Sequence, residues 1–166
     1  MQIPYRKPGK DSQVKPDPFL TADKVAAMEV ELARLINHSR PKAIEDSQAA
    51  AQNGDFSENV EYQIAKGRLR GINHRILVLE HQLKQAVIIN PEKNSDTVEL
   101  GHTVTIESAG KQKTFQILGS SETDPVAGII SHNSPIGEAL IGHRVGETVT
   151  IKPADREIQY KIIKIS

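Results

Sequence analysis

Cysteine is absent from the 166-residue sequence, which excludes disulfide bonds, thiol catalysis and cysteine-ligated zinc sites within it. No run of about 18 apolar residues occurs, so no segment has the composition of a membrane-spanning helix. The first residues also lack the apolar core of a secretory signal. We therefore expect a cytoplasmic protein with no membrane partner.

An excess of either charge is also absent, because 21 Lys and Arg residues balance 21 Asp and Glu residues. Zero net charge disfavours a protein that coats duplex DNA by charge alone, so only local charge clusters could bind nucleic acid. Aromatic residues make up only 4% of the chain. Within residues 98–166 they are Phe115 and Tyr160, too few for the aromatic-lined pocket of a peptidyl-prolyl isomerase. The six histidines show no metal-binding spacing.

Residues 1–20 contain four of the nine prolines together with several charged residues. Such a segment buries too little apolar surface to offset its ordering entropy, and we predict a flexible tail. At Thr21 the pattern changes to that of a capped helix N-terminus. Apolar residues then recur at spacings of three and four, as in a coiled coil: Val25, Met28, Leu32 and Leu35. Pro41 is expected to kink or end this first helical segment.

A second and longer seam follows the turn signal Asn53-Gly54. Its members alternate in spacing between three and four without interruption: Tyr62, Ala65, Leu69, Ile72, Ile76, Leu79, Leu83 and Ala86. Two helices joined by a tight turn form an antiparallel αα-hairpin. At about 1.5 Å per residue, helices of roughly 30 residues reach on the order of 45 Å, so the hairpin should project from a body. We place this coiled-coil hairpin at residues 21–89, with its tip at 53–59.

Residues 90–97 are predicted to be a polar linker to a segment with β-type patterns. Short apolar stretches between Val98 and Ile163 predict a small antiparallel sheet. One short helix is expected between Pro135 and Gly142, because Ser134 can cap a helix that a proline opens. The predicted fold class is therefore α+β, with an N-terminal hairpin followed by a β domain at residues 98–166.

The predicted tip concentrates three acidic residues, Asp55, Glu58 and Glu61. One interpretation is structural: Asp55 caps the second helix, Glu58 closes a capping box and Glu61 favours the helix N-terminus. The other interpretation is functional, since carboxylates offer the hard oxygen ligands that suit Mg²⁺. A pair on a tip has no enclosing pocket, so it would complete a metal site that lies in another protein. The two interpretations are compatible with each other.

The tip sequence GDFSENVEY at residues 54–62 resembles the signature of the Gre transcript cleavage factors, G-D-x-[SK]-E-N-A-[ED]-Y. Val60 replaces the usual alanine. The resemblance extends from Thr21 to the C-terminus and includes the segment NSPIGEALIG at residues 133–142. The second helix resembles the GreB branch more than the GreA branch, through Tyr62-Gln63, residues 66–72 and Arg75.

This resemblance implies a transcription elongation factor that is not itself an enzyme. Its hairpin would enter the secondary channel of bacterial RNA polymerase, where Asp55 and Glu58 would help to hold the second catalytic Mg²⁺ and position the attacking water. The polymerase would then cleave backtracked nascent RNA near its 3′ end and restart. The free protein, which we expect to be a monomer, would hold no stable metal. The β domain would be FKBP-like and would dock near the channel rim through Ser134, Pro135 and Ile136.

Four cations and no acid occur between residues 66 and 75: Lys66, Arg68, Arg70 and Arg75. A solvated helix face is one explanation. The other is a strip that attracts the phosphates of displaced nascent RNA, similar to the basic patch of GreB-like proteins. Lys66 and Arg70 form the leading pair because residues four apart share a helix face.

Two other functions are weighed against the cleavage factor. A Gre-like regulator could occupy the polymerase channel and inhibit or modulate transcription without inducing cleavage. A self-sufficient nuclease or isomerase is disfavoured, because the sequence shows no pocket-forming set of catalytic residues.

Overall fold

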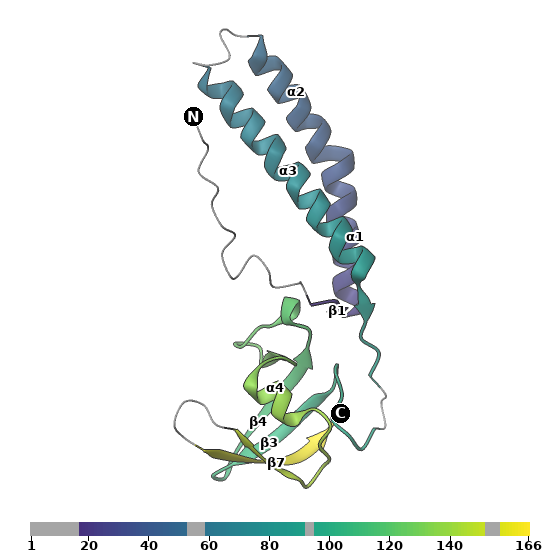
Figure 1. The fold of residues 1–166 in the computed structure, drawn as a ribbon, viewed down its shortest axis with the longest axis vertical. Helices are drawn as coiled ribbons and strands as arrows, with labels where there is room; N and C mark the ends of the chain where they lie inside the picture. The colour runs from purple at the N-terminus through teal and green to yellow at the C-terminus, as the bar shows by residue number, and fades with distance from the viewer. Residues whose placement is uncertain (1–16, 53–58, 92–94, 152–156) are drawn as a thin grey trace, which may run out of the picture. The chain divides into compact units, whose positions relative to one another are not determined.

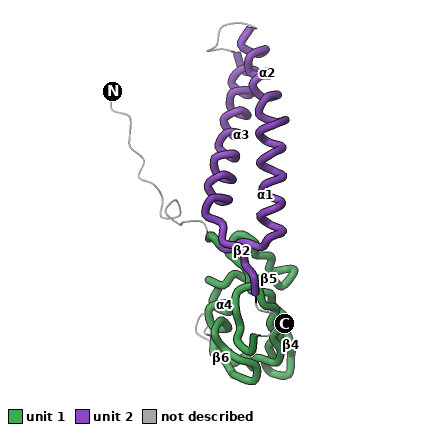
Figure 2. The backbone as a smooth tube through the Cα atoms, turned by 90° about the vertical axis from the view of Figure 1, so that its right-hand side faces the viewer, with its two compact units in different colours: residues 1–18, 93–166 green, residues 19–92 purple. Residues whose placement is uncertain are grey.

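The computed structural model describes residues 17–52, 59–91, 95–151 and 157–166. The chain divides into two compact units, which Figure 2 shows in different colours. The hairpin unit is Phe19–Glu92, and the sheet unit combines Lys93–Ser166 with Met1–Pro18. None of the described helices is both long enough and apolar enough to cross a membrane.

The hairpin unit consists of two helical arms that run side by side (Figure 1). The first arm comprises α1 (Ala22–Arg34), a π-helical turn (Leu35–Ser39) and α2 (Arg40–Ala51), and the second arm is α3 (Val60–Gln85). α1 begins as predicted, because Thr21 Oγ1 accepts a hydrogen bond from the backbone N–H of Lys24 at 3.2 Å. The predicted coiled-coil hairpin is therefore confirmed.

Pro41 does not end the first arm. It lies in the first turn of α2, directly after the π-helical turn, and Ser39 and Arg40 both keep helical backbone angles. Proline has no N–H to donate and its ring crowds the preceding turn. The π-helical turn is wider because its hydrogen bonds reach back five residues, as from Arg40 N to Leu35 O. The first α-helical segment therefore ends at Arg34, before Pro41, and the arm continues through this wider turn into α2.

Apolar residues of the two predicted seams form the core of the hairpin unit. The buried seam residues are Met28, Leu35, Ile76 and Leu79, and Leu20, which lies outside the seams, is buried with them; Val25, Leu32, Ile72, Leu83 and Ala86 pack against this cluster. Nearer to the tip, the buried residues of the first arm are Ala43 and Ala50, which are 2% and 8% exposed. Ile44 is instead 37% exposed.

Residues 17–20 belong to the folded units, which corrects the end of the predicted tail. β1 (Phe19–Leu20) pairs in parallel with β2 (Val87–Ile88). Leu20 is 3% exposed in the core of the hairpin unit. Its partner strand is distant in sequence, so the local composition of the tail could not reveal this pairing. Residues 1–16 lie outside the described part of the chain.

The sheet unit contains a five-stranded sheet in the order β5-β4-β3-β7-β6. The strands are β3 (Thr103–Ser108), β4 (Lys111–Leu118), β5 (Ile129–Ser131), β6 (Thr148–Ile151) and β7 (Ile158–Ile165). A 3₁₀ turn (Ser120–Glu122) follows β4, and α4 (Pro135–Leu140) lies over one face of the sheet (Figure 1).

The predicted α+β class is confirmed, but the sheet is mixed rather than purely antiparallel. β4 and β5 run parallel, whereas the other neighbouring strands are antiparallel. Alternating side chains mark a strand without fixing its direction. The connection from Leu118 to Ile129 is too long for a tight hairpin turn, and it returns the chain so that β5 runs alongside β4.

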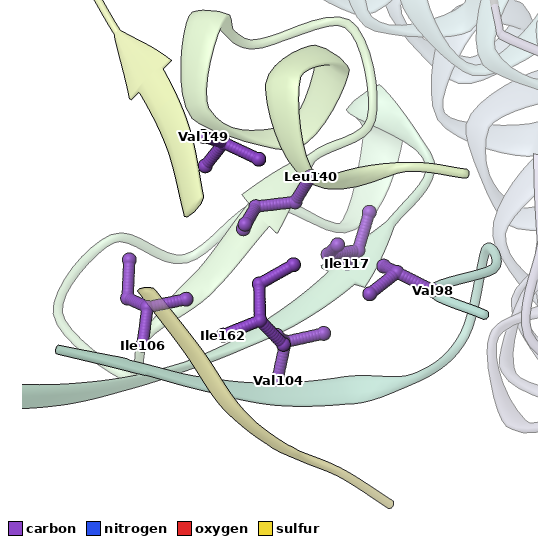
Figure 3. Packing of buried hydrophobic residues seen from close by; sticks show 7 residues of the cluster. All are labelled: Val98, Val104, Ile106, Ile117, Leu140, Val149 and Ile162. Carbon is purple, nitrogen blue, oxygen red and sulfur yellow. The ribbon is translucent and has the colours of Figure 1, made fainter. Parts of the chain in front are cut away.

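The core of the sheet unit lies between the sheet and α4. Figure 3 shows its buried side chains converging: Val98, Val104, Ile106, Ile117, Leu140, Val149 and Ile162. Leu140 comes from α4 and is fully buried. Its burial fixes α4, and therefore the segment before it, against the sheet.

Gly137 allows α4 to approach the end of β5 closely. A Cβ atom at this position would collide with the backbone carbonyl oxygen of Ser131. We expect Gly137→Ala to lower the free energy of unfolding by about 1–3 kcal/mol, because backbone must shift to admit the methyl group. Urea unfolding of this variant checks the prediction, with Glu138→Ala at the neighbouring exposed position as the matched control. Equal stability of the two variants would contradict the close approach.

Candidate functional site

The predicted acidic tip connects the two arms of the hairpin unit. Asp55 and Glu58, the predicted Mg²⁺-holding pair, lie outside the described residues, which resume at Asn59. Glu61 is described, and it lies exposed in the first turn of α3. The geometry next to the tip is therefore set by the end of α2 and the start of α3.

A single side chain, that of Asn59, joins these two helix ends. Its Oδ1 accepts a hydrogen bond from the backbone N–H of Tyr62 at 3.0 Å, so Asn59 is the N-cap of α3. Its Nδ2 donates to the backbone carbonyl oxygen of Ala50 in α2 at 2.7 Å. Asn59 thus gives a hydrogen-bond partner to one backbone group at each helix end, an N–H of α3 and a carbonyl of α2, and links the two arms next to the tip.

This cap corrects one part of the structural interpretation of the tip acids, while Glu61 does lie in the first turn of the helix as that interpretation expected. The structural interpretation made Asp55 the N-cap of the second helix, but α3 begins at Val60 and its N-cap is Asn59. The capping-box explanation of Asp55 and Glu58 is therefore wrong. Sequence reasoning missed Asn59 because several residues near a turn have the chemistry of a cap, and only the backbone shows which one precedes the first helical residue.

Asn59 offers a direct test of its two hydrogen bonds. We expect Asn59→Ala to lower the free energy of unfolding by about 1 kcal/mol or more, because both helix ends lose a partner. Asn59→Ser keeps an oxygen for the N-cap and loses only the donor to Ala50, so it should recover part of that loss. Thermal unfolding followed by the helical circular-dichroism signal checks this order. A serine variant as unstable as the alanine variant would contradict the capping role.

Arg75, one of the four predicted RNA contacts, is engaged within the hairpin unit. Its Nε and Nη2 donate to Oε1 and Oε2 of Glu31, each at 2.8 Å, in a two-pronged pair between α3 and α1. The hydrogen bond from Arg75 lowers the pKa of Glu31, and the same bond raises the pKa of Arg75. Because the carboxyl pKa is lowered by folding, the pair stabilises the fold above the ordinary carboxyl pKa. That contribution is lost as the pH falls through the folded-state value.

The other three predicted RNA contacts, Lys66, Arg68 and Arg70, are exposed along α3. Lys66 Nζ lies 5.5 Å from the ring centroid of Tyr62, a cation–π distance. Arg68 is 68% exposed, with Nη1 4.0 Å from Asp46 Oδ2, so this ion pair restrains it weakly. These three cations can therefore bind an anion from solution more readily than Arg75, whose guanidinium is already paired with Glu31.

Side chains of the first arm, among them Arg34 and Lys42, extend this basic surface. Arg34, His38 and Lys42 follow one another at four-residue intervals, so they share one helix face. Together with Arg68 they line a hollow of about 470 Å³ between the two arms. Their four-residue spacing is already visible in the sequence. Among the described residues, Asp46 is the one acid that lines this hollow.

The predicted docking segment, Ser134, Pro135 and Ile136, opens α4 in the sheet unit. Ser134 is its N-cap: Oγ accepts from the backbone N–H of Gly137 at 3.1 Å and donates to the Ser131 carbonyl oxygen at 2.6 Å. Pro135 is exposed, whereas Ile136 is partly buried against the core. The predicted cap is confirmed, and Pro135 is the member of the segment that is most open to a partner.

Among the described residues, no three His, Asp or Glu side chains cluster closely enough to hold a metal ion. Asp55 and Glu58 lie outside the described residues, so their role in holding Mg²⁺ stays a prediction.

Comparison with known proteins places the chain in a family. Residues 18–88 match the model "Transcription elongation factor, N-terminal", and residues 92–166 match "Transcription elongation factor, GreA/GreB, C-term". A relative from Macrococcus caseolyticus named Transcription elongation factor GreA is 37% identical over 89% of this chain and 95% of its own. The protein of the same name from Bacillus subtilis is 38% identical over the same shares of the two chains.

A solved structure, that of GreA factor homolog 1 of Thermus thermophilus, is 26% identical with a TM-score of 0.40 and covers 89% of this chain and 97% of its own. The named relatives are GreA proteins, so the GreB-like character of α3 stays a prediction. With relatives of this similarity along almost their whole length, the chain belongs to the GreA/GreB family of transcription elongation factors.

Proposed function

We propose that this protein binds bacterial RNA polymerase and stimulates the polymerase to cleave backtracked nascent RNA, so that an arrested complex restarts. The observation that carries this proposal is the cap at Asn59. It rules out Asp55 as the N-cap of α3, and Asp55 and Glu58 belong to the segment of sequence that connects the two arms. Two acids without that capping role are candidates for binding a partner.

In this proposal the hairpin enters the secondary channel and brings the tip to the active centre of the polymerase. Asp55 and Glu58 would hold a Mg²⁺ ion jointly with polymerase carboxylates and would orient the attacking water. The ion would supply Lewis-acid activation of the phosphodiester bond. The chain acts as an accessory factor, because its own residues provide only part of the metal site.

The basic surface of the hairpin supports a role in holding RNA. Lys66, Arg68 and Arg70 are exposed on α3, and the hollow lined by Arg68 and Lys42 carries further positive charge. Displaced RNA is a flexible polyanion, and clustered cations attract its phosphates. We propose that these side chains hold the 3′ segment of the RNA, while Ser134, Pro135 and Ile136 dock the sheet unit on the polymerase.

The experiment follows 3′-labelled RNA in a stalled, backtracked polymerase complex with and without the protein. Release of short 3′ fragments that depends on the protein would support the proposal. Slower elongation without fragments would instead identify a regulator that blocks the channel. Cleavage of RNA by the protein and Mg²⁺ without polymerase would identify a self-sufficient nuclease and would overturn the accessory role.

A further inference from the structure

A polar cluster in the sheet unit joins Asp17 to the loops that precede α4. The Asp17 carboxylate accepts a hydrogen bond from the backbone N–H of Ser120 at 2.7 Å. The same oxygen, Oδ2, lies 3.3 Å from Nδ1 of His132. The Asp17 side chain is 5% exposed and that of His132 is 19% exposed, so the contact is shielded from water.

The cluster continues from Ser120 to the turn before the docking segment. Ser120 Oγ and Ser131 Oγ are 2.8 Å apart, and Asn133 Nδ2 donates to Ser120 Oγ at 3.3 Å. The backbone N–H of Asn133 donates to Ser131 Oγ at 3.1 Å. Ser134 Oγ in turn donates to the Ser131 carbonyl oxygen. An unbroken chain of polar contacts therefore leads from Asp17 to the N-cap of α4.

Burying a carboxylate costs free energy unless hydrogen bonds compensate for it. Asp17 is held by groups that lie more than a hundred positions away in sequence, and it lies in a stretch whose composition predicts a tail. The contact is therefore a specific feature of the fold. Its effect is to restrain the loop at Ser120 and the turn from Ser131 to Ser134 together.

We infer that Asp17 is a positioning residue for the docking segment: it holds the turn at Ser131–Ser134 in the conformation that presents Pro135 to RNA polymerase. This inference rests on the proposed function, because it assigns the same docking surface to the polymerase. It gives the segment before the hairpin a role in partner affinity rather than in the chemistry at the tip.

The test compares full-length Asp17→Ala and Asp17→Asn with wild type. Asp17→Asn keeps an oxygen that can accept the Ser120 N–H and loses the negative charge beside His132. Asp23→Ala, which removes the same charge from an exposed position in the first turn of α1, is the matched control. The readouts are hydrogen exchange of the Ser120 amide in the free protein, the affinity for polymerase, and RNA cleavage as a function of protein concentration.

We expect Asp17→Ala to speed Ser120 exchange and to raise the dissociation constant for polymerase, and the concentration for half-maximal cleavage, on the order of 10-fold. The maximal cleavage rate should not change. Asp17→Asn should fall between Asp17→Ala and wild type, and Asp23→Ala should match wild type. Unchanged exchange, or faster exchange with unchanged affinity, would overturn the role of Asp17 alone. Wild-type protein that does not bind polymerase would overturn both the proposed function and this inference.

Discussion

The Asp55→Ala, Glu58→Ala double variant is expected to lose at least about 100-fold of the cleavage that wild-type protein stimulates in a backtracked complex. The reason is electrostatic. Two carboxylates that hold a divalent cation and orient the attacking water stabilise charge that develops in the transition state, and catalysis is sensitive to the loss of such groups. Binding to the polymerase should be retained, because the docking segment and the basic residues are untouched.

The matched control is Glu61→Ala. Glu61 is an exposed acid in the first turn of α3, so its removal changes the charge near the tip without removing either proposed ligand. Cleavage rates at saturating protein, together with a direct binding measurement, separate the two effects. If the double variant cleaves as Glu61→Ala does, the proposed metal role fails. If it loses binding and cleavage together, the acids contact the polymerase rather than the ion.

The largest effect on stability is expected from Leu79→Ala in the hairpin core. Leu79 is 0% exposed and packs between the two arms, so truncation leaves a cavity that the rigid helices close only partly. Such substitutions cost about 2–5 kcal/mol in free energy of unfolding. Two residues earlier on the same helix, Leu77 is 64% exposed. Leu77→Ala should therefore change the stability by less than about 0.5 kcal/mol.

Denaturant unfolding followed by the helical circular-dichroism signal measures both leucine variants. The helical signal reports mainly on the hairpin unit, which matters because the two units of the chain need not unfold together. A small loss for Leu79→Ala, or equal losses for the two variants, would contradict the packing of α3 against α1.

Much of the hairpin could be predicted from the sequence, because packing of two helices against each other requires apolar residues at spacings of three and four. Met28, Leu35, Ile76 and Leu79 all lie on the predicted seams and are buried. The repeat predicts which residues are buried, because positions at these spacings lie on the same face of a helix and pack against the other helix.

The features that the sequence did not reveal depend on partners that are distant along the chain or on backbone detail. Leu20 pairs with β2 and packs in the helical core, and Asp17 contacts Ser120 and His132, all of them distant in sequence except the start of the hairpin. β5 runs parallel to β4 because of the path of the segment that connects the two strands, and the three residues of β5 do not reveal this direction. At the tip, the choice of Asn59 as the cap depends on where the helical backbone begins.

The buried alanines of the first arm affect how closely the two helices of the hairpin can pack. Beyond the π-helical turn, the buried positions are Ala43 and Ala50, whereas nearer the base they are Met28 and Leu35. The separation of two packed helices depends on the size of the side chains between them. Alanines therefore permit a closer approach of α2 to α3 than methionine and leucine would permit. In the proposed entry of the hairpin into the secondary channel, these small packing residues lie toward the end that enters first.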